Sequence, residues 1–193
     1  LPLNLKIKTI TSVHDIQFVH YPEYFSFYQR NVQNIMFKLT FNHSDNIQVN
    51  SKFIETDLIK NFKVPENKMI FINQGVDPKR IIKKSNKIIK KLIFFPAQIW
   101  PHKNHFLVLE TMKRLIEIDP QFKLIMVGEN FSNINLNEMI ENLKLKKNVK
   151  YFGRVSLRNL NRLYNLADIV LCPSLYESGS LPTLEAILIN KNV

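Results

Sequence analysis

The alternation of short apolar runs with amphipathic stretches in the second half of the chain constrains the fold more than any other feature. The apolar runs cover residues 92–97, 122–128 and 149–152, and a fourth extends from Asp168 to Pro173. Runs of this length are typical of strands buried in a parallel sheet. The helices expected between them cover residues 104–118, 135–145 and 157–166. The series predicts a doubly wound α/β layer, in which ligands bind outside the carboxyl ends of the strands.

The first part of the chain shows the same alternation. Strands are expected at 5–13, 46–50 and 69–72, with a loop from His14 to Pro22. Helices are expected over the aromatic-rich residues 23–42 and, capped by Ser51, over 51–62. We interpret the aromatic side chains of 23–42 as core residues and not as a platform that stacks bases. A second parallel α/β layer is therefore predicted here.

A lysine-rich stretch at residues 78–91 breaks this pattern, and we interpret it as a linker. It separates residues 1–77, the C-terminal part of one α/β domain, from residues 92–193, most of a second domain. The chain begins with Leu1 and not with Met, which suggests a processed product or a fragment. A single cysteine, Cys172, allows no internal disulfide and fits a reducing cytoplasm. No apolar run approaches the roughly 18 residues of a membrane span, and no secretory signal is present.

The net charge of +11 is compatible with several anionic partners. Nucleic-acid readers depend on Arg for base edges and phosphates, but 21 of the 27 basic residues here are Lys. We therefore expect no nucleic-acid partner. The lysines at 79–91 favour contact with anionic lipid head groups, and a positive field also suits an anionic substrate.

The stretch that follows the last predicted strand carries the chemistry of the chain. Ser180 is a good N-cap and Pro182 suits a first helical turn, so a strand, a small-residue loop and a helix are expected. The start of such a helix can bind an anion, commonly a diphosphate in α/β proteins. Glu177 and Glu185 flank it and could accept hydrogen bonds from sugar hydroxyls. A capped helix with two solvated glutamates is the alternative interpretation.

Two histidine-containing segments are further candidates. In Trp100-Pro-His-Lys-Asn-His105, Lys103 could hold a diphosphate or could be a solvated turn lysine. His102 and His105 lack the partners of a zinc site, so no metal is expected. His14 and Asp15, at a strand end, could act as acid or base or make a structural hydrogen bond. The four glycines form neither G-x-G-x-x-G nor a G-x-x-x-x-G-K loop, which disfavours both of those nucleotide-binding classes.

Several of these segments together resemble motifs of the retaining GT-B glycosyltransferases of family 4. Glu177 and Glu185 have the spacing of its E-x7-E signature, and residues 95–105 resemble a P-A-Q-x-W-P-H-K-N-H variant. His14-Asp15, Asn50-Ser51, Asn73–Asp77 and Tyr151–Arg154 resemble its His-Asp strand end, a helix entry, an N-G-V-D turn and a nucleobase loop. The resemblance covers residues 5–190 and implies two Rossmann-like domains, both incomplete in this chain.

The resemblance also implies roles for individual residues. His14, Lys103 and Glu177 would be catalytic, with Lys103 on the donor diphosphate and Glu177 on the sugar hydroxyls. Glu185 would bind the ribose, and Gly153 and Arg154 the nucleobase. Gln98 stands where many members have Arg, which makes a phosphate role for it doubtful. The phosphate would also meet the loop and helix start formed by Ser178, Gly179, Ser180 and Leu181.

The implied reaction transfers a sugar from a UDP- or GDP-sugar to a glycan or lipid-linked acceptor with retention of configuration. No obligatory metal and no cofactor are expected. The work would belong to cell-surface polysaccharide synthesis in the cytoplasm, with peripheral contact at the inner face of the membrane. A GT-B-fold nucleotide-sugar epimerase and a non-catalytic nucleotide-sugar-binding subunit are the alternatives. The resemblance also implies that N-terminal βαβ units and closing C-terminal elements are missing, so the chain alone is expected to be inactive.

Overall fold

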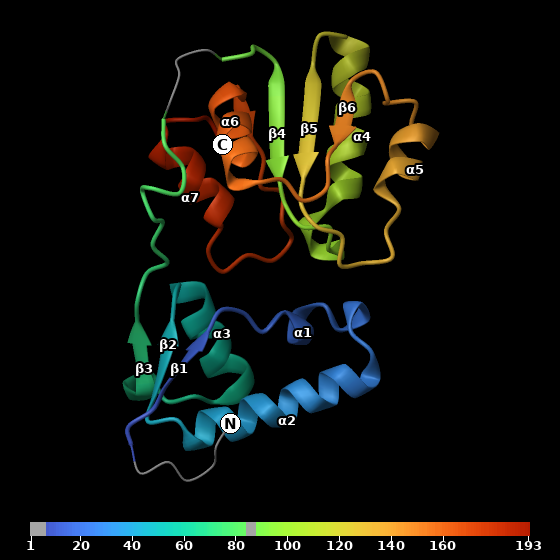
Figure 1. The fold of residues 1–193 in the computed structure, drawn as a ribbon. Helices are drawn as coiled ribbons and strands as arrows, with labels where there is room; N and C mark the ends of the chain where they lie inside the picture. The colour runs from blue at the N-terminus through green and yellow to red at the C-terminus, as the bar shows by residue number, and fades with distance from the viewer. Residues whose placement is uncertain (1–6, 84–87) are drawn as a thin grey trace. The chain divides into compact units, whose positions relative to one another are not determined.

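The computed structural model describes residues 7–83 and 88–193. The chain forms two compact units. Unit 1 contains residues 1–75 together with Glu177–Gly179, and unit 2 contains Val76–Tyr176 and Ser180–Val193. Both units are parallel sheets with helical connections (Figure 1), which confirms the predicted α/β class.

Unit 1 is a three-stranded parallel sheet whose strands lie in chain order. The strands are β1 (Ile10–Val13), β2 (Asn46–Val49) and β3 (Met69–Phe71). The two long helices are α2 (Phe27–His43) and α3 (Lys52–Phe62). Each has a serine N-cap, because the Ser26 hydroxyl accepts from the Gln29 N–H and the Ser51 hydroxyl from the Ile54 N–H. The predicted cap at Ser51 is confirmed.

Two expectations for unit 1 were inaccurate. The strand expected over 5–13 covers only Ile10–Val13 among the described residues, since residues 7–9 lie outside it and residues 5 and 6 are outside the described ranges. The expected loop from His14 to Pro22 contains the short helix α1 (Gln17–His20), and the 3-10 turns η1 (Pro22–Tyr24) and η2 (Glu66–Lys68) complete the unit. Asp15 helps start α1, because its carboxylate accepts from the Gln17 N–H at 3.2 Å.

The aromatic residues of α2 divide between core and surface. Phe37 packs on Phe18 and Phe41, with ring centroids 5.4 and 5.5 Å apart, and Phe41 packs edge-on against Phe62 at 5.2 Å. These contacts confirm the core interpretation for Phe37 and Phe41. Tyr28, by contrast, is 76% exposed, because helical periodicity turns its side chain away from the sheet.

Unit 2 is a four-stranded parallel sheet of order β6-β5-β4-β7. The strands are β4 (Leu92–Pro96), β5 (Lys123–Val127), β6 (Val149–Tyr151) and β7 (Ile169–Val170). The helical segments are η3 (Pro101–Lys103), α4 (His105–Ile118), α5 (Leu136–Asn142), α6 (Leu157–Leu166) and α7 (Leu181–Leu188). From β4 the chain continues to β5 and β6 on one side and later returns to β7 on the other. The direction of winding therefore reverses at β4, and such a reversal is where open α/β sheets bind ligands.

Both faces of this sheet are covered, as strand alternation requires. Ile93 and Phe95 of β4 face a cluster that contains Val108, Leu109 and Met112 of α4 and residues of α5. Phe94, between them, faces the opposite cluster with Tyr164, Ala186 and Ile81. Helical spacing predicts Phe106, Leu109, Met112 and Ile116 as the apolar face of the helix over 104–118. This was partly wrong, because Phe106 is 62% exposed and the buried stripe runs through His105, Val108, Leu109 and Met112.

Candidate functional site

The loops after the four strands of unit 2 are tied to one another by backbone hydrogen bonds. Gly128 N–H donates to the Gly153 carbonyl at 2.9 Å, and Ile99 N–H to the Glu129 carbonyl at 2.9 Å. Leu175 N–H, after β7, donates to the His102 carbonyl at 2.8 Å. The segments that carry the predicted residues Gln98, Lys103, Gly153 and Arg154 therefore meet at the carboxyl edge of one sheet.

Gly128 makes this close approach of the loops possible. Its φ is +148°, and a Cβ built on it would lie 2.0 Å from the Ala97 carbonyl oxygen and 2.8 Å from the Gln98 nitrogen. No side chain fits in that space, so only glycine permits the loop after β5 to pack against the end of β4. Gly153, at φ +65°, also has a left-handed conformation. Close packing thus explains Gly128, and the left-handed backbone conformation explains Gly153.

The predicted strand–loop–helix after β7 is present. The Ser180 hydroxyl accepts from the Thr183 N–H at 3.3 Å, which confirms Ser180 as the N-cap of α7, and Pro182 lies in the first turn. Cys172 Sγ lies 2.8 Å from the same hydroxyl. The start of α7 thus has a fixed geometry, with the partial positive charge that helix N-termini carry.

Glu185 does not have the solvated position that the alternative interpretation assigned to it. Its side chain is buried, and both carboxylate oxygens have partners within unit 2. Arg80 Nε donates to Oε1 at 2.5 Å, and the Tyr164 hydroxyl donates to Oε2 at 2.7 Å. Burial of Tyr164, strengthened by the neighbouring carboxylate, raises the pKa of its phenol. Tyr164 therefore remains a donor throughout the physiological pH range.

The remaining polar residues of the predicted site in unit 2 are more exposed. The Gln98 side chain is exposed, and its oxygen accepts from Trp100 Nε1 at 3.4 Å. Arg154 pairs with Glu129 at 3.5 Å, but the two side chains are 81% and 48% exposed, so the pair stabilises the fold by less than about 1 kcal/mol. Lys103 ends η3 and is half-buried. Neither Gln98 nor Arg154 is held rigidly by its side-chain contacts.

His14, Glu177, Ser178 and Gly179 are grouped with unit 1. Lys103 and Glu185 belong to unit 2. His14 follows β1 directly and is exposed, whereas Glu177 is half-buried.

His105 has a structural setting. It is 3% exposed and its ring packs on Phe95 with a centroid distance of 4.7 Å. Burial lowers the pKa of His105 to about 4, opposed in part by a backbone hydrogen bond with Ala97. The imidazole is therefore neutral at pH 7. Among the described residues, no group of three or more His, Cys, Asp or Glu side chains is placed to hold a metal ion.

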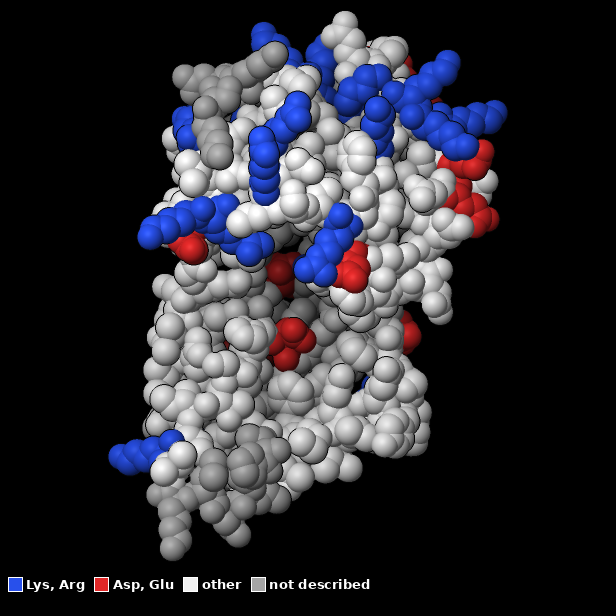
Figure 2. Space-filling model, viewed as in Figure 1, with Lys and Arg blue, Asp and Glu red and all other residues white. Residues whose placement is uncertain are grey.

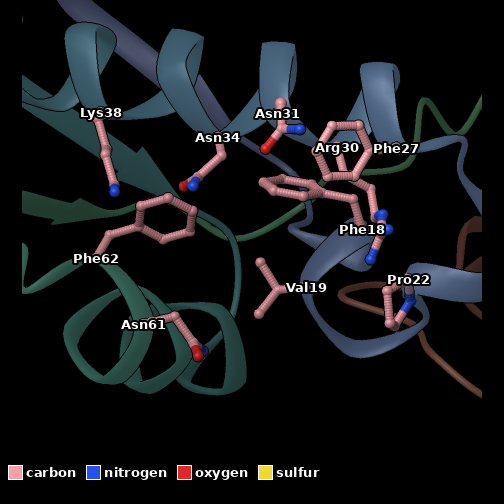
Figure 3. A pocket seen from close by; sticks show the side chains of 10 residues that line it. All are labelled: Phe18, Val19, Pro22, Phe27, Arg30, Asn31, Asn34, Lys38, Asn61 and Phe62. Carbon is pink, nitrogen blue, oxygen red and sulfur yellow. The ribbon is translucent and has the colours of Figure 1, made fainter.

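A pocket of about 420 Å³ lies within unit 1, between α1, α2 and α3. Figure 3 shows Asn31, Asn34 and Lys38 of α2 above the rings of Phe18 and Phe62. The predicted site residues are not among those that line it.

Sequence reasoning missed two partners of Glu185. Arg80 falls in the lysine-rich stretch interpreted as a linker, and Tyr164 lies in the helix expected over 157–166, to which no site residue was assigned. A possible signal for Arg80 is that Ile81-Ile82 follows it, since an apolar pair in a basic stretch indicates burial, and Ile81 is 1% exposed. In unit 1, sequence reasoning also missed the contact between His20 Nε2 and Asp57 Oδ2, which lie 2.7 Å apart.

Two α/β units with parallel sheets, with polar residues at strand ends, are the architecture expected of the GT-B fold. Solved structures confirm this fold. The Anabaena protein Alr3699/HepE, in complex with UDP and glucose, has a TM-score of 0.76 and 21% identity over 95% of this chain and 51% of its own. A sucrose-phosphate synthase from Thermosynechococcus elongatus has a TM-score of 0.72 and 17% identity over 97% of this chain and 50% of its own.

The family follows from the sequence. The model described as "Glycosyl transferases group 1" matches residues 77–193, and the model "Glycosyltransferase Family 4" matches residues 1–80. The chain belongs to the glycosyl transferases group 1 family. It is 28% identical over 193 residues to the O-antigen chain mannosyltransferase RfbU of Salmonella typhimurium, and 25% identical over 150 residues to the uncharacterized glycosyltransferase MJ1607 of Methanocaldococcus jannaschii. The matches include 100% and 71% of this chain, respectively. The chain therefore spans only 52% and 38% of the length of these two relatives.

Proposed function

We propose that the protein represented by this chain transfers a glycosyl group from a nucleotide-sugar donor to a glycan or lipid-linked acceptor. The observation that carries the proposal is the Glu185 carboxylate, buried one turn inside a serine-capped helix of a group 1 glycosyltransferase domain. Arg80 and Tyr164 each donate one hydrogen bond to this carboxylate, and each of its oxygens has a second lone pair that could accept from a donor hydroxyl. The solved relative in complex with UDP and glucose supports a UDP-type donor, with a GDP-sugar as the other candidate.

The proposed roles follow the sequence expectation. In unit 2, Lys103 and the amides at the start of α7, from Ser180 and Leu181, would stabilise the departing diphosphate. Glu185 would accept the ribose hydroxyls, while Gly153 and Arg154 would border the nucleobase. Gln98 lacks the charge to neutralise a phosphate. The mechanism needs no resident metal, because the lysine and the helix start supply the positive charge.

The residues of unit 1 complete the proposal. His14 and Glu177 would act on the donor sugar, and the Ser178 and Gly179 backbone would contact the phosphate. We further propose that the reaction retains the anomeric configuration and serves the synthesis of a cell-surface polysaccharide. The O-antigen mannosyltransferase relative supports the latter assignment.

The proposed location is the cytoplasm, with peripheral contact at the inner face of the membrane. Within the described ranges, every helix is too short or too polar to cross a bilayer. The basic residues are unevenly divided, since residues 76–193 hold 19 of the 27 Lys and Arg. On the face shown in Figure 2, basic side chains gather over unit 2, where an anionic lipid surface or an anionic substrate would be attracted.

The test is a thermal-shift panel of nucleotide sugars with the full-length protein, because a ligand that binds the native state raises its melting temperature. Glu185→Ala should weaken binding of the stabilising nucleotide about ten-fold or more, since a charge-assisted hydrogen bond contributes about 1.5–3 kcal/mol. Arg114→Ala, an exposed change on α4, is the control. Equal affinity of Glu185→Ala and the native protein would refute the proposed site. Product analysis separates a transferase from a GT-B-fold epimerase, and absence of donor consumption identifies a non-catalytic binder.

A further inference from the structure

The carboxylate of Glu185 is held by two donors that come from different parts of unit 2. Arg80 Nε reaches Oε1 and the Tyr164 hydroxyl reaches Oε2, at 2.5 and 2.7 Å. One bond to each oxygen fixes both the position and the plane of the carboxylate. A carboxylate oxygen has two lone-pair directions, so each oxygen retains one for a further donor. Two neighbouring hydroxyls are the ligand groups that match such a pair of acceptors.

Tyr164 is fixed independently of the ligand. It is fully buried and packs edge-on against Phe94, with a centroid distance of 5.0 Å and an angle of 85° between the rings. Its neighbours in the core include Ala186, the residue next to Glu185. Because a buried phenol needs a partner for its hydroxyl, the packing of the ring and the bond to Glu185 support each other.

The backbone on both sides of Arg80 is also held in place. The turn before it is closed by two bonds to Asp77: the Lys79 N–H donates to the Asp77 carboxylate and the Arg80 N–H to the Asp77 carbonyl, each at 2.9 Å. After it, Ile81 is buried in the cluster that contains Tyr164.

Side chains of helix α6 form hydrogen bonds with the backbone of the segment that contains Arg80. Asn165 Nδ2 donates to the Ile82 carbonyl at 3.0 Å. The Asn161 amide bonds to the backbone of Arg80 in one orientation and to that of Ile82 in the other. Asn161 and Asn165 are both buried. The guanidinium of Arg80 is therefore held at Glu185 by a segment that belongs to the core of unit 2, even though its side chain is 44% exposed.

We propose that Tyr164 and Arg80 are positioning residues that hold the Glu185 carboxylate in the orientation that accepts both hydroxyls of the donor's ribose. This inference rests on the proposed function, which assigns the ribose to Glu185. Arg80 balances the buried negative charge, and Tyr164 sets the carboxylate plane. Loss of either partner should weaken recognition of the ribose diol more than recognition of the rest of the nucleotide.

The experiment measures the affinity of the full-length protein for a nucleoside diphosphate and for its 2′,3′-dideoxy analogue by isothermal titration calorimetry. UDP and GDP are both tried, and the tighter ligand is used. The native protein should prefer the diphosphate with both hydroxyls about ten-fold or more, because the analogue cannot form the hydrogen bonds to the charged carboxylate, each worth about 1.5–3 kcal/mol. In Tyr164→Phe and Arg80→Met this preference should shrink to about three-fold or less, and Arg80→Lys should restore part of it.

The controls separate this role from a general loss of structure. Arg114→Met removes an exposed charge of the same unit and should keep the native preference. A variant that is merely destabilised would lose affinity for both ligands in proportion, and the ratio of the two would stay unchanged. A native preference that persists in Tyr164→Phe and Arg80→Met overturns the inference and leaves the proposed function intact. If the native protein binds both ligands equally, or binds neither diphosphate, the ribose role of Glu185 fails and the inference fails with it.

Discussion

Replacement of Gly128 by alanine tests the packing that brings the strand-end loops together. The added Cβ would lie 2.0 Å from the Ala97 carbonyl oxygen and 2.5 Å from its carbonyl carbon, both backbone atoms that cannot rotate away. The φ of +148° adds strain for any residue with a side chain. A strained conformation costs about 1–3 kcal/mol and overpacking about 1–3 kcal/mol, so we expect Gly128→Ala to destabilise unit 2 by about 2–6 kcal/mol.

The assay is urea unfolding followed by the fluorescence of Trp100. This residue is the only tryptophan of the chain and lies in the loop after β4, so its signal reports on unit 2. Thr111→Ala is the control, because Thr111 is an exposed residue of α4 in the same unit, and it should change the free energy of unfolding by less than about 0.5 kcal/mol. If Gly128→Ala and the native protein unfold at the same urea concentration, the loops do not pack as closely as the structure indicates.

Two further predictions concern the core of unit 2. Because burial lowers the pKa of His105 from 6.5 to about 4, the unfolded chain binds its proton more tightly, and stability present above pH 6.5 should be lost as the pH falls towards 4. The loss of unfolding free energy from this residue is about 3 kcal/mol. In urea unfolding between pH 7 and 4, the free energy of unfolding of His105→Leu should therefore fall less steeply than that of the native protein. Equal slopes for the two proteins would contradict the burial of a neutral His105. Leu109→Ala should cost about 2–5 kcal/mol and Phe106→Ala less than about 1 kcal/mol in the same assay, since Leu109 is buried and Phe106 is exposed; the reverse order would mean that the buried face of α4 is misassigned.

Local signals predicted most of the secondary structure. Ser51, Ser156 and Ser180 each cap the helix expected after them, because a cap depends on residues only three positions apart. The apolar runs of unit 2 became strands, since their sequences favour burial on both faces. The expected strand at 168–173 shortened to Ile169–Val170, because pairing with β4 covers only two residues.

The contacts of the candidate site were harder to predict. The pairing of Arg80 with Glu185 joins residues 105 positions apart, and a lysine-rich neighbourhood concealed the arginine. The burial of Glu185 also depends on tertiary packing, which the E-x7-E spacing does not encode. The phase of α4 was misjudged because Phe106 and His105 are adjacent, and hydrophobicity alone favoured the phenylalanine for the core. The sequence thus identified candidate residues, and the structure identified what holds one of them.

The most direct test of the proposed function is the reaction itself. The full-length protein is incubated with the nucleotide sugar that stabilises it and with an acceptor extract, and the product is examined by NMR at the anomeric carbon. The account predicts that the sugar appears on the acceptor with the anomeric configuration it had in the donor, and that Glu185→Ala slows its appearance. Transfer with inverted configuration would contradict the proposed retention, and failure of any nucleotide sugar to bind or react would contradict the central claim.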